Sequence, residues 1–241
     1  MSAAEKPTTS VWTHPRRPQR EQLTREQIAA AAIELLDADG IEALSMRKLG
    51  TRLDAPATSL NRHVANKDEL IQLVVDDVYG EGQVPAAADR TQWRAAVTRT
   101  ATDLRAMTLR HPWIAPELGR VGLVHIGPNA LRMSSGLLAQ FEAAGFPTDE
   151  KDRAVGTLTA YVIGIATSEA AYLSLIARSD RTEQEWVADL RPAFDEAAQQ
   201  NPRLREGSSA RQDVHPQQIR DNDFAYGPDR VLDDLTARLD A

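Results

Sequence analysis

Residues 44–70 constrain the fold of this chain more than any other segment, because they contain two short amphipathic helices joined by a tight turn. The sequence LSMRKLGTRLDAPATSLNRHVANKDEL is interrupted by Asp-Ala-Pro at residues 54–56, where a helix cannot continue. Each predicted helix has one apolar face, and the side chains expected to be buried are Met46, Leu49, Leu53, Ala57, Leu60 and Val64. Such a helix-turn-helix is the geometry that places one helix in the major groove of DNA.

The side chains left outside on these helices are of kinds that can contact base edges and phosphates. The candidate DNA-binding residues are Arg47, Lys48, Ala57, Thr58, Ser59, Asn61, Arg62, His63 and Lys67. Lys67 would lie in the first turn of the next helix, where the helix dipole disfavours a cation by about 0.3–1 kcal/mol. A DNA phosphate beside Lys67 would offset that cost.

Capping signals mark the helices on both sides of this segment. Thr24 and Gln27 form a capping box, and Asn66 with Glu69 repeats the pattern at a second helix start. Gly40 is expected to end the first of these helices in a left-handed conformation. The sequence therefore predicts a DNA-binding domain over residues 23–80, although the same pattern also fits a three-helix packing unit with solvated charges.

The distribution of charge along the chain favours DNA binding by the N-terminal part. The net charge is −7, which is unexpected for a DNA-binding protein. However, the chain up to Lys67 holds ten basic and eight acidic residues, whereas the remainder holds 18 basic and 27 acidic residues. A basic head on an acidic body is the asymmetry expected if only the head meets nucleic acid.

Residues 1–22 are rich in Pro, Ser and Thr and contain three arginines close together. A segment of this composition cannot bury enough apolar surface to fold alone, so we expect disorder. Two interpretations stay open: a basic arm that enters the minor groove, or a leader whose charge has no role.

Residues 23–79 resemble the N-terminal domain of the TetR family of one-component transcriptional regulators. The family signature T-L-Y-x-H-F/V-x-x-K-x-x-L corresponds here to residues 59–70, SLNRHVANKDEL. In three places the sequence departs from the family pattern: Asn61 replaces a tyrosine, Asp54 a turn glycine, and Pro56 begins the recognition helix. Asn61 could read an adenine edge, and Asp tolerates the left-handed region at modest cost.

Residues 81–241 are predicted to form a larger helical domain for ligand binding and dimerisation. Three motifs, HPWIAPELG at 111–119, GPNAL at 127–131 and FEAAGFPTDE at 141–150, resemble the C-terminal domain of the tetracycline-repressor subgroup. This resemblance implies an effector cavity between helices. Large side chains on the helices expected to converge there are Met107, Trp113, Met133, Leu137, Phe141, Tyr161 and Tyr172.

Residues 154–177 contain a single charge, Glu169, and could be taken for a membrane span. We reject that interpretation, because the run is rich in small residues and a central carboxylate is costly in lipid. The small residues share one helix face, and by resemblance this helix and the last one form a four-helix dimer interface. Its candidate residues are Gly156, Ala160, Gly164, Thr167, Ala171, Val231, Leu235 and Leu239. The alternative is an intrachain core helix.

The remaining C-terminal segments and the absent motifs complete the prediction. We expect a helix over residues 183–200, a loop over 201–227 and a final helix over 228–239. The sequence has no zinc-protease, nucleophile-elbow, dinucleotide or Walker motif, so no enzyme, metal or cofactor is predicted. The absence of cysteine suits a reducing cytoplasm.

Together these features predict an all-α homodimeric regulator: an N-terminal three-helix DNA-binding domain followed by a larger helical domain. We expect it to bind a near-palindromic double-stranded DNA operator in the cytoplasm, without membrane contact, and to be released from DNA by an unknown small molecule. Two rivals remain open: an effector-independent architectural DNA-binding protein, and a helical enzyme or binding protein that reuses the domain.

Overall fold

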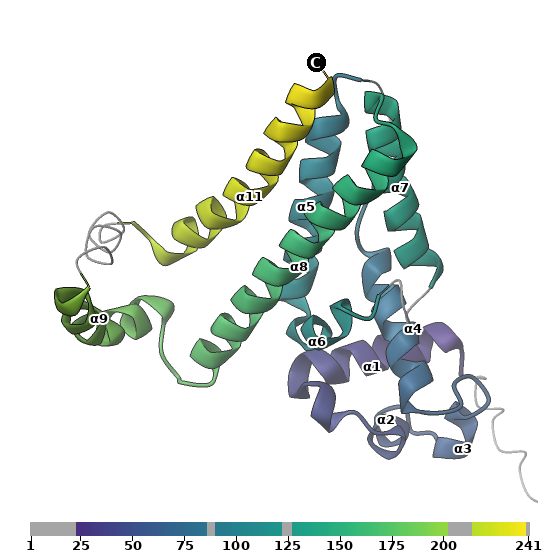
Figure 1. Ribbon diagram of the computed structural model, residues 1–241. Coiled ribbons are helices and arrows are strands. Elements are labelled where there is room, and N and C mark those ends of the chain that lie inside the picture. The colour runs from purple at the N-terminus through teal and green to yellow at the C-terminus, as the bar shows by residue number, and fades with distance from the viewer. Residues whose placement is uncertain (1–22, 86–89, 122–126, 202–213, 240–241) are drawn as a thin grey trace, which may run out of the picture.

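The computed structural model describes residues 23–85, 90–121, 127–201 and 214–239, and every secondary-structure element in these ranges is a helix. The predicted all-α fold is therefore confirmed. The predicted basic arm, residues 1–22, lies outside the described residues. Figure 1 shows a small group of helices, α1 to α4, below a larger group that includes the long helices α5, α7, α8 and α11.

The small group begins with α1 (Arg25–Asp39), which starts at the predicted capping box. Thr24 Oγ1 accepts a hydrogen bond from the Gln27 N–H, and the Gln27 side chain accepts one from the Thr24 N–H. The helix ends at Gly40, whose φ of 77° is positive as predicted, but whose ψ of 174° is extended rather than left-handed helical. Only glycine adopts that combination readily.

Four further helices complete the small group. The 3₁₀ helix η2 (Ile41–Ala43) leads to α2 (Met46–Arg52), α3 (Ala57–Leu60) and α4 (Lys67–Gly80). Their apolar faces meet α1 in a core whose fully buried members include Ile28, Leu36, Leu49, Leu60 and Leu70. Burial of these faces, rather than helix propensity, holds such short helices together.

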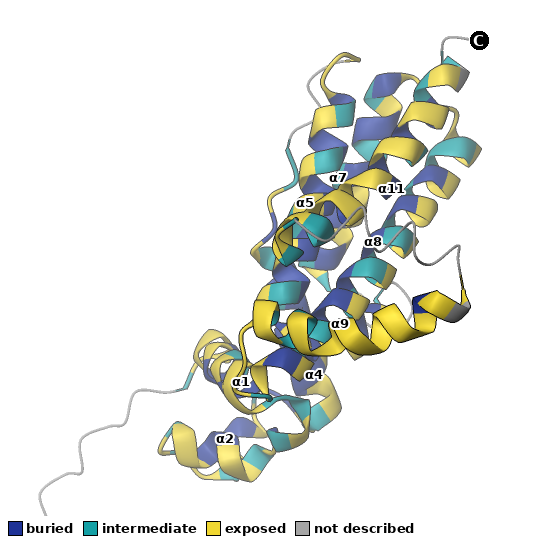
Figure 2. Cartoon of the chain, turned by 90° about the vertical axis from the view of Figure 1, so that its left-hand side faces the viewer, coloured by how far each residue is buried: buried dark blue, intermediate teal, exposed yellow. Residues whose placement is uncertain are grey.

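The larger group is built on three long helices that pack against one another: α5 (Trp93–Arg110), α7 (Pro128–Ala144) and α8 (Thr148–Ala177). The short helices η3 (Pro112–Ile114) and α6 (Ala115–Leu118) follow α5 and pack on α8. α9 (Glu183–Gln200) extends away from the body and is largely exposed (Figures 1 and 2), whereas α11 (Pro216–Leu239) packs along α8 and α5.

The helix α4 connects the two groups, and its C-terminal half is embedded in the larger one. The buried Asp76 of α4 accepts hydrogen bonds from the backbone N–H groups of Asn129 and Ala130, both at 3.0 Å. A carboxylate from α4 therefore caps the N-terminus of α7, where the helix dipole favours a negative charge. The hydrophobic core is continuous from α1 to α11, so the two groups do not have separate interiors.

The single charge in the apolar run of α8 is bound inside the protein. Glu169 accepts from Arg105 of α5 through two bonds of 2.6 and 2.7 Å, and from Arg220 Nε of α11 at 2.9 Å. By length and composition α8 could cross a membrane. The two arginines explain why the helix carries a carboxylate, since a buried charge must be paired.

The C-terminal helix is longer than predicted. It begins at Pro216, whereas the sequence was expected to form a loop over residues 201–227 and a helix only from Pro228. Pro228 lies inside the helix instead of starting it. The first half of the helix is mostly polar, so its buried side could not be recognised from an apolar pattern. That side includes the buried Phe224 and Arg220, which binds Glu169. Tertiary contacts thus stabilise a helical segment that has little local apolar pattern.

Candidate nucleic-acid interface and internal cavity

The turn between α2 and α3 is a close-packed corner. The Ala55 N–H donates to the Gly50 carbonyl at 2.8 Å, and a Cβ at position 50 would lie only 2.6 Å from the Ala55 oxygen. Asp54 stands where the family pattern has a turn glycine, and its φ of 46° confirms the predicted left-handed conformation. The corner fixes the direction in which α3 leaves α2.

The recognition helix presents the predicted face to solvent. α3 is assigned to Ala57–Leu60, but helical hydrogen bonds continue from the Asn61 N–H to Ala57 and from the Val64 N–H to Leu60, both at 3.1 Å. Leu60 and Val64 are buried. Of the candidate DNA contacts on this helix, the exposed ones are Thr58, Asn61 and Arg62, and the half-buried ones are Ala57, Ser59 and His63.

The basic candidates differ in how firmly the protein holds them. Arg47 is exposed, whereas Lys48 forms an ion pair of 2.6 Å with Asp39 of α1. Lys67 is half-buried, and its Nζ donates to the Ile41 carbonyl at 3.1 Å. That carbonyl supplies part of the compensation that the sequence led us to expect from an external anion. Two N–H groups of the ammonium remain for other acceptors.

The cap before α4 differs slightly from the predicted box. Asn66 Oδ1 accepts from the Glu69 N–H at 2.9 Å, as predicted. The Glu69 carboxylate, however, accepts from the Ala65 N–H at 2.7 Å rather than from the Asn66 N–H. The reciprocal bond therefore reaches one residue further back and ties the end of the recognition segment to α4.

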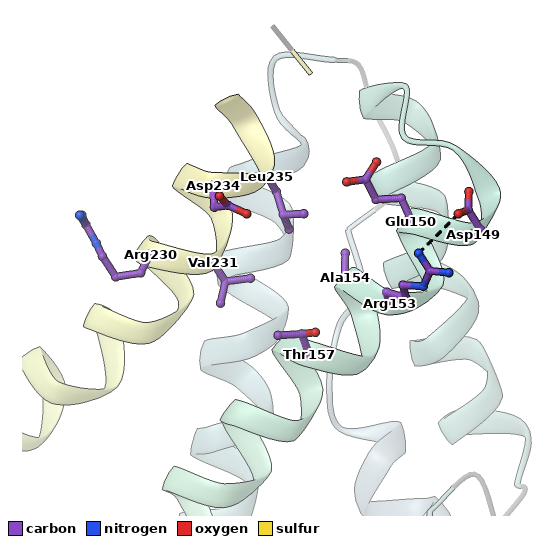
Figure 3. Close-up of a pocket in the computed structure, with 9 residues that line it drawn as sticks. All are labelled: Asp149, Glu150, Arg153, Ala154, Thr157, Arg230, Val231, Asp234 and Leu235. Carbon is purple, nitrogen blue, oxygen red and sulfur yellow. Dashed lines mark ion pairs between the residues drawn. The ribbon is translucent and has the colours of Figure 1, made fainter. Parts of the chain in front are cut away.

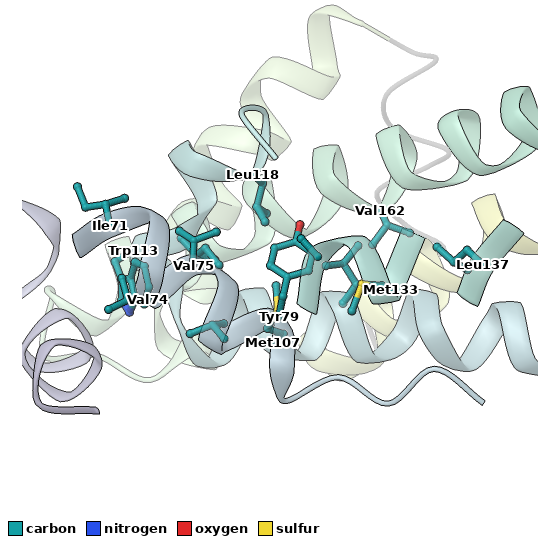
Figure 4. Close-up of a cluster of buried hydrophobic side chains, with 14 of the residues drawn as sticks. Ile71, Val74, Val75, Tyr79, Met107, Trp113, Leu118, Met133, Leu137 and Val162 are labelled. Carbon is teal, nitrogen blue, oxygen red and sulfur yellow. The ribbon is translucent and has the colours of Figure 1, made fainter. Parts of the chain in front are cut away.

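A cavity of about 120 Å³ lies between α4 and the larger group of helices, and two of its lining residues, Leu131 and Ser134, are exposed to solvent. Its lining residues come from α4, α5, α6, α7 and α8 and from the segment after α6: Tyr79, Leu104, Leu118, Val121, Ala130, Leu131, Met133, Ser134, Leu137, Val155, Thr159 and Ile163. None of them is charged, and the polar side chains are the hydroxyls of Tyr79, Ser134 and Thr159. Figure 4 shows Tyr79, Leu118, Met133 and Leu137 within the surrounding apolar cluster.

Tyr79 is one of the residues of the cavity wall that the sequence did not single out. It lies one residue before the end of α4, the helix that also carries Lys67 at its start. Burial raises the pKa of Tyr79 to about 12, so the phenol stays protonated at neutral pH and can donate a hydrogen bond. A polar group on an otherwise apolar helix face was the signal that could have identified it, as it could for Ser134 and Thr159.

Only Met133 and Leu137 of the seven predicted pocket residues line this cavity. Phe141 packs in an aromatic cluster with Trp93 and Phe146, with ring centroids 5.4 to 5.5 Å apart.

The other four predicted pocket residues also lie outside the cavity. Met107 is buried in α5 beside a separate groove. Trp113 donates to Asp37 of α1, the hydroxyl of Tyr161 donates to the Asp223 carbonyl of α11, and Tyr172 is half-buried on α8. Size and helical position thus identified five buried and two half-buried residues, of which two line the cavity.

The predicted dimer face of α8 is open in the single chain. Gly156, Ala160, Gly164 and Ala171 are exposed, and Thr167 is half-buried. On α11, Val231 and Leu239 are half-buried and Leu235 is buried.

A groove of about 670 Å³ separates the first half of α8 from α11 (Figure 3). Its lining residues are Asp149, Glu150, Arg153, Ala154, Thr157, Arg230, Val231, Asp234 and Leu235, and therefore carry both signs of charge.

Comparisons with known proteins agree with this geometry. Residues 28–74 match the family described as bacterial regulatory proteins, tetR family, and residues 84–239 match the tetracyclin repressor-like C-terminal domain. A helix-turn-helix transcriptional regulator of Saccharopolyspora erythraea is 39% identical over 180 residues, which cover 71% of this chain and 75% of that protein.

Two further relatives cover nearly the whole chain. The helix-turn-helix transcriptional repressor DrrR1 of Streptomyces coeruleorubidus is 29% identical over 229 residues, or 93% of this chain and 83% of that one. The crystal structure of the Streptomyces coelicolor protein ActR in complex with actinorhodin superposes with a TM-score of 0.72 at 27% identity, covering 90% of this chain and 98% of ActR.

The open recognition helix, the cavity behind it and both domain matches lead to one conclusion. The chain is a transcriptional regulator with a DNA-binding domain, not an enzyme, and it belongs to the TetR family.

Proposed function

We propose that this regulator is a homodimeric repressor that binds a near-palindromic operator and leaves it when a small molecule fills the cavity. One observation carries the proposal: α4 supports the recognition helix at one end and forms a wall of the cavity, through Tyr79, at the other. A ligand that fits one position of α4 better than another shifts the spacing of the recognition helices.

The dimer would form through α8 and α11. Four of the five small residues on this face of α8, Gly156, Ala160, Gly164 and Ala171, are exposed in the single chain, so most of the face lacks a cover. Its small residues permit close approach of a second helix, and the groove beside it carries both signs of charge. A two-fold interface pairs one patch with itself, so it needs such self-complementarity. This arrangement also accounts for the apolar helix without a membrane, in a protein we place in the cytoplasm.

The cavity lining indicates the chemistry of the effector. It has three hydroxyls and no charge, so it favours a neutral, largely apolar molecule that can exchange hydrogen bonds with hydroxyls. A volume of about 120 Å³ is small, so a larger effector would have to push α6, α7 or α8 outward. Such a displacement would reach α4 through Asp76 and Tyr79. The complex of ActR with actinorhodin supports the binding of a small molecule, and the repressor name of DrrR1 supports repression.

The proposal is tested by selecting DNA bound by the full chain from a random pool. We expect enrichment of a near-palindrome whose half-sites lie about 34–36 Å apart, one helical turn of DNA. A neutral, hydroxyl-bearing aromatic library should then contain compounds that release that DNA, whereas charged analogues of the same size should not.

Two outcomes would contradict the proposal. Weak enrichment without symmetry would indicate an architectural DNA-binding protein. If a palindromic site is strongly enriched but no neutral compound releases the protein from it, the proposed operator is supported and the proposed effector class is refuted.

A further inference from the structure

A polar cluster, in which His111 and Trp113 are buried and the carboxylates of Asp37 and Glu81 reach solvent, joins the DNA-binding domain to the larger domain at a point away from the cavity. Asp37, near the end of α1, accepts from the ring nitrogen Nδ1 of His111 and from the indole Nε1 of Trp113, both at 2.7 Å. His111 Nε2 lies 3.1 Å from Glu81 Oε1 at the end of α4, and Arg110 forms an ion pair with the same carboxylate. Four elements, α1, α4, α5 and η3, meet here.

His111 is the centre of this cluster. It is 4% exposed, and each of its ring nitrogens faces a carboxylate oxygen, one from α1 and one from the end of α4. A carboxylate only accepts, so each ring nitrogen bonds to its carboxylate only when that nitrogen carries a proton. The Trp113 ring packs against it in a T-shaped arrangement with centroids 6.1 Å apart. The bonds are directional, and a small movement of α1 relative to α5 would break them.

We propose that Asp37, His111, Trp113 and Glu81 form a latch that sets the orientation of the DNA-binding domain relative to the larger domain. The helix α4 joins the two domains and packs against helices of both, so it sets most of their relative position. Asp37 adds a second, directional attachment, from α1 to the segment that follows α5. These four residues are therefore positioning residues for the recognition helix, which they do not touch.

The chemistry of the cluster suits a switch better than a permanent joint. Each hydrogen bond of the cluster contributes only about 0.5–1.5 kcal/mol net, and water can replace it at the exposed carboxylates of Asp37 and Glu81. Hydrogen bonds between fixed partners have a made and a broken state, which gives an interface two discrete arrangements. The latch fixes the domain orientation whether or not the proposed function is correct. Its opening when effector binds rests on the proposed function.

The orientation can be measured directly because the chain contains no cysteine. Cysteines introduced at the exposed positions Thr51 in α2 and Arg99 in α5 would carry a pair of spin labels, one in each domain. Distances are recorded on the full chain without DNA or ligand. An excess of unlabelled protein ensures that, in any dimer, a labelled chain is paired with an unlabelled one.

We expect one narrow distance distribution for the parent and a broadened or shifted one for Asp37→Ala. His111→Ala should have the same effect, and the double variant should add little, because both changes break one contact. Both donors bond to the same oxygen of Asp37, Oδ1, so Asp37→Asn can keep both bonds and should stay close to the parent. Glu34→Ala is the matched control: Glu34 is also on α1 but pairs with Arg52 inside the DNA-binding domain.

A distribution for Asp37→Ala that equals the parent's, with circular dichroism showing a folded protein, would overturn the latch. If Asp37→Ala fails to fold, His111→Ala decides by the same criterion. The selected operator gives a second readout: affinity should fall roughly tenfold if the competent orientation drops to about a tenth of the population. Because the distances need neither operator nor effector, they test the latch even if the proposed function is wrong.

Discussion

Asn61 stands at the exposed end of the recognition helix, at the position where the family pattern has a tyrosine. Its amide can pair with an adenine edge, so Asn61→Ala should cost about 1–3 kcal/mol at one base pair and relax the preference there. Titration of operator variants, one base pair at a time, checks this. An equal loss on every variant would mean that Asn61 contacts a phosphate.

Lys67→Ala provides the contrasting prediction at the residue scale. A lysine on a phosphate contributes equally to all sequences, so the variant should bind every operator variant more weakly and flatten the salt dependence by about one unit. Because Lys67 also binds the Ile41 carbonyl, unfolding in urea must be measured alongside. Lost discrimination with an unchanged salt dependence would refute the phosphate contact.

Tyr79 leads to a prediction about alkaline stability. Its pKa is about 12 in the folded protein and near 10 when unfolded, because burial disfavours the phenolate. The folded state therefore holds this proton more tightly. The stabilisation is complete below pH 10, and about 3 kcal/mol is lost as pH rises from 10 to 12. Tyr79→Phe should lose less stability over that interval. The exposed Tyr226→Phe is the control and should follow the parent, as measured by urea unfolding at each pH.

At the scale of elements, the ion pairs around Glu169 hold α5, α8 and α11 together. The hydrogen bonds that Arg105 donates to the Glu169 carboxylate raise the pKa of Arg105, so the guanidinium stays charged. Glu169→Ala removes the partner that the two arginines share, although Arg105 keeps Asp221 and Arg220 keeps Glu183. The variant should lower the free energy of unfolding by about 1–3 kcal/mol. The control on the same helix is Asp149→Ala, which removes an exposed pair with Arg153 and should change little. Equal effects of the two variants would contradict the structural role of the cluster.

Helices were predictable wherever they carry caps or an apolar period. α1 begins at the Thr24 capping box, and α9 runs from Glu183 to Gln200 as expected. α11 was predicted twelve residues too short, because only its second half has an apolar period that the sequence alone reveals. Arg220 in its first half stabilises the helix by binding Glu169, a residue 51 positions away.

At the scale of the whole molecule, Gly164 tests the assembly separately from the fold. A Cβ at this position would meet no atom within 4 Å in the single chain, so Gly164→Leu should not strain the protomer. In a dimer the leucine would force two helices apart, at about 1–3 kcal/mol for each copy. We therefore expect a helical monomer with lost operator affinity, measured by sedimentation equilibrium, circular dichroism and DNA titration.

The matched control for Gly164→Leu is Ala95→Leu, on an exposed position of α5 away from the α8 face. It should remain a dimer and bind DNA normally. An intact dimer for Gly164→Leu, with unchanged DNA binding, would show that the small-residue face of α8 is not the interface.

The sequence by itself determined the class of fold, the helix-turn-helix and the exposed face of the recognition helix. These follow from local rules: caps, the turn at Asp54 and the alternation of buried and exposed positions along one helix. Only the tertiary structure decided which residues line the cavity and which charges meet. Asp37 and His111 lie 74 positions apart, and Tyr79 faces Met133 only because α4 and α7 pack in one particular rotation. A helical period shows which side of a helix is buried, but it does not encode which helix that side will meet.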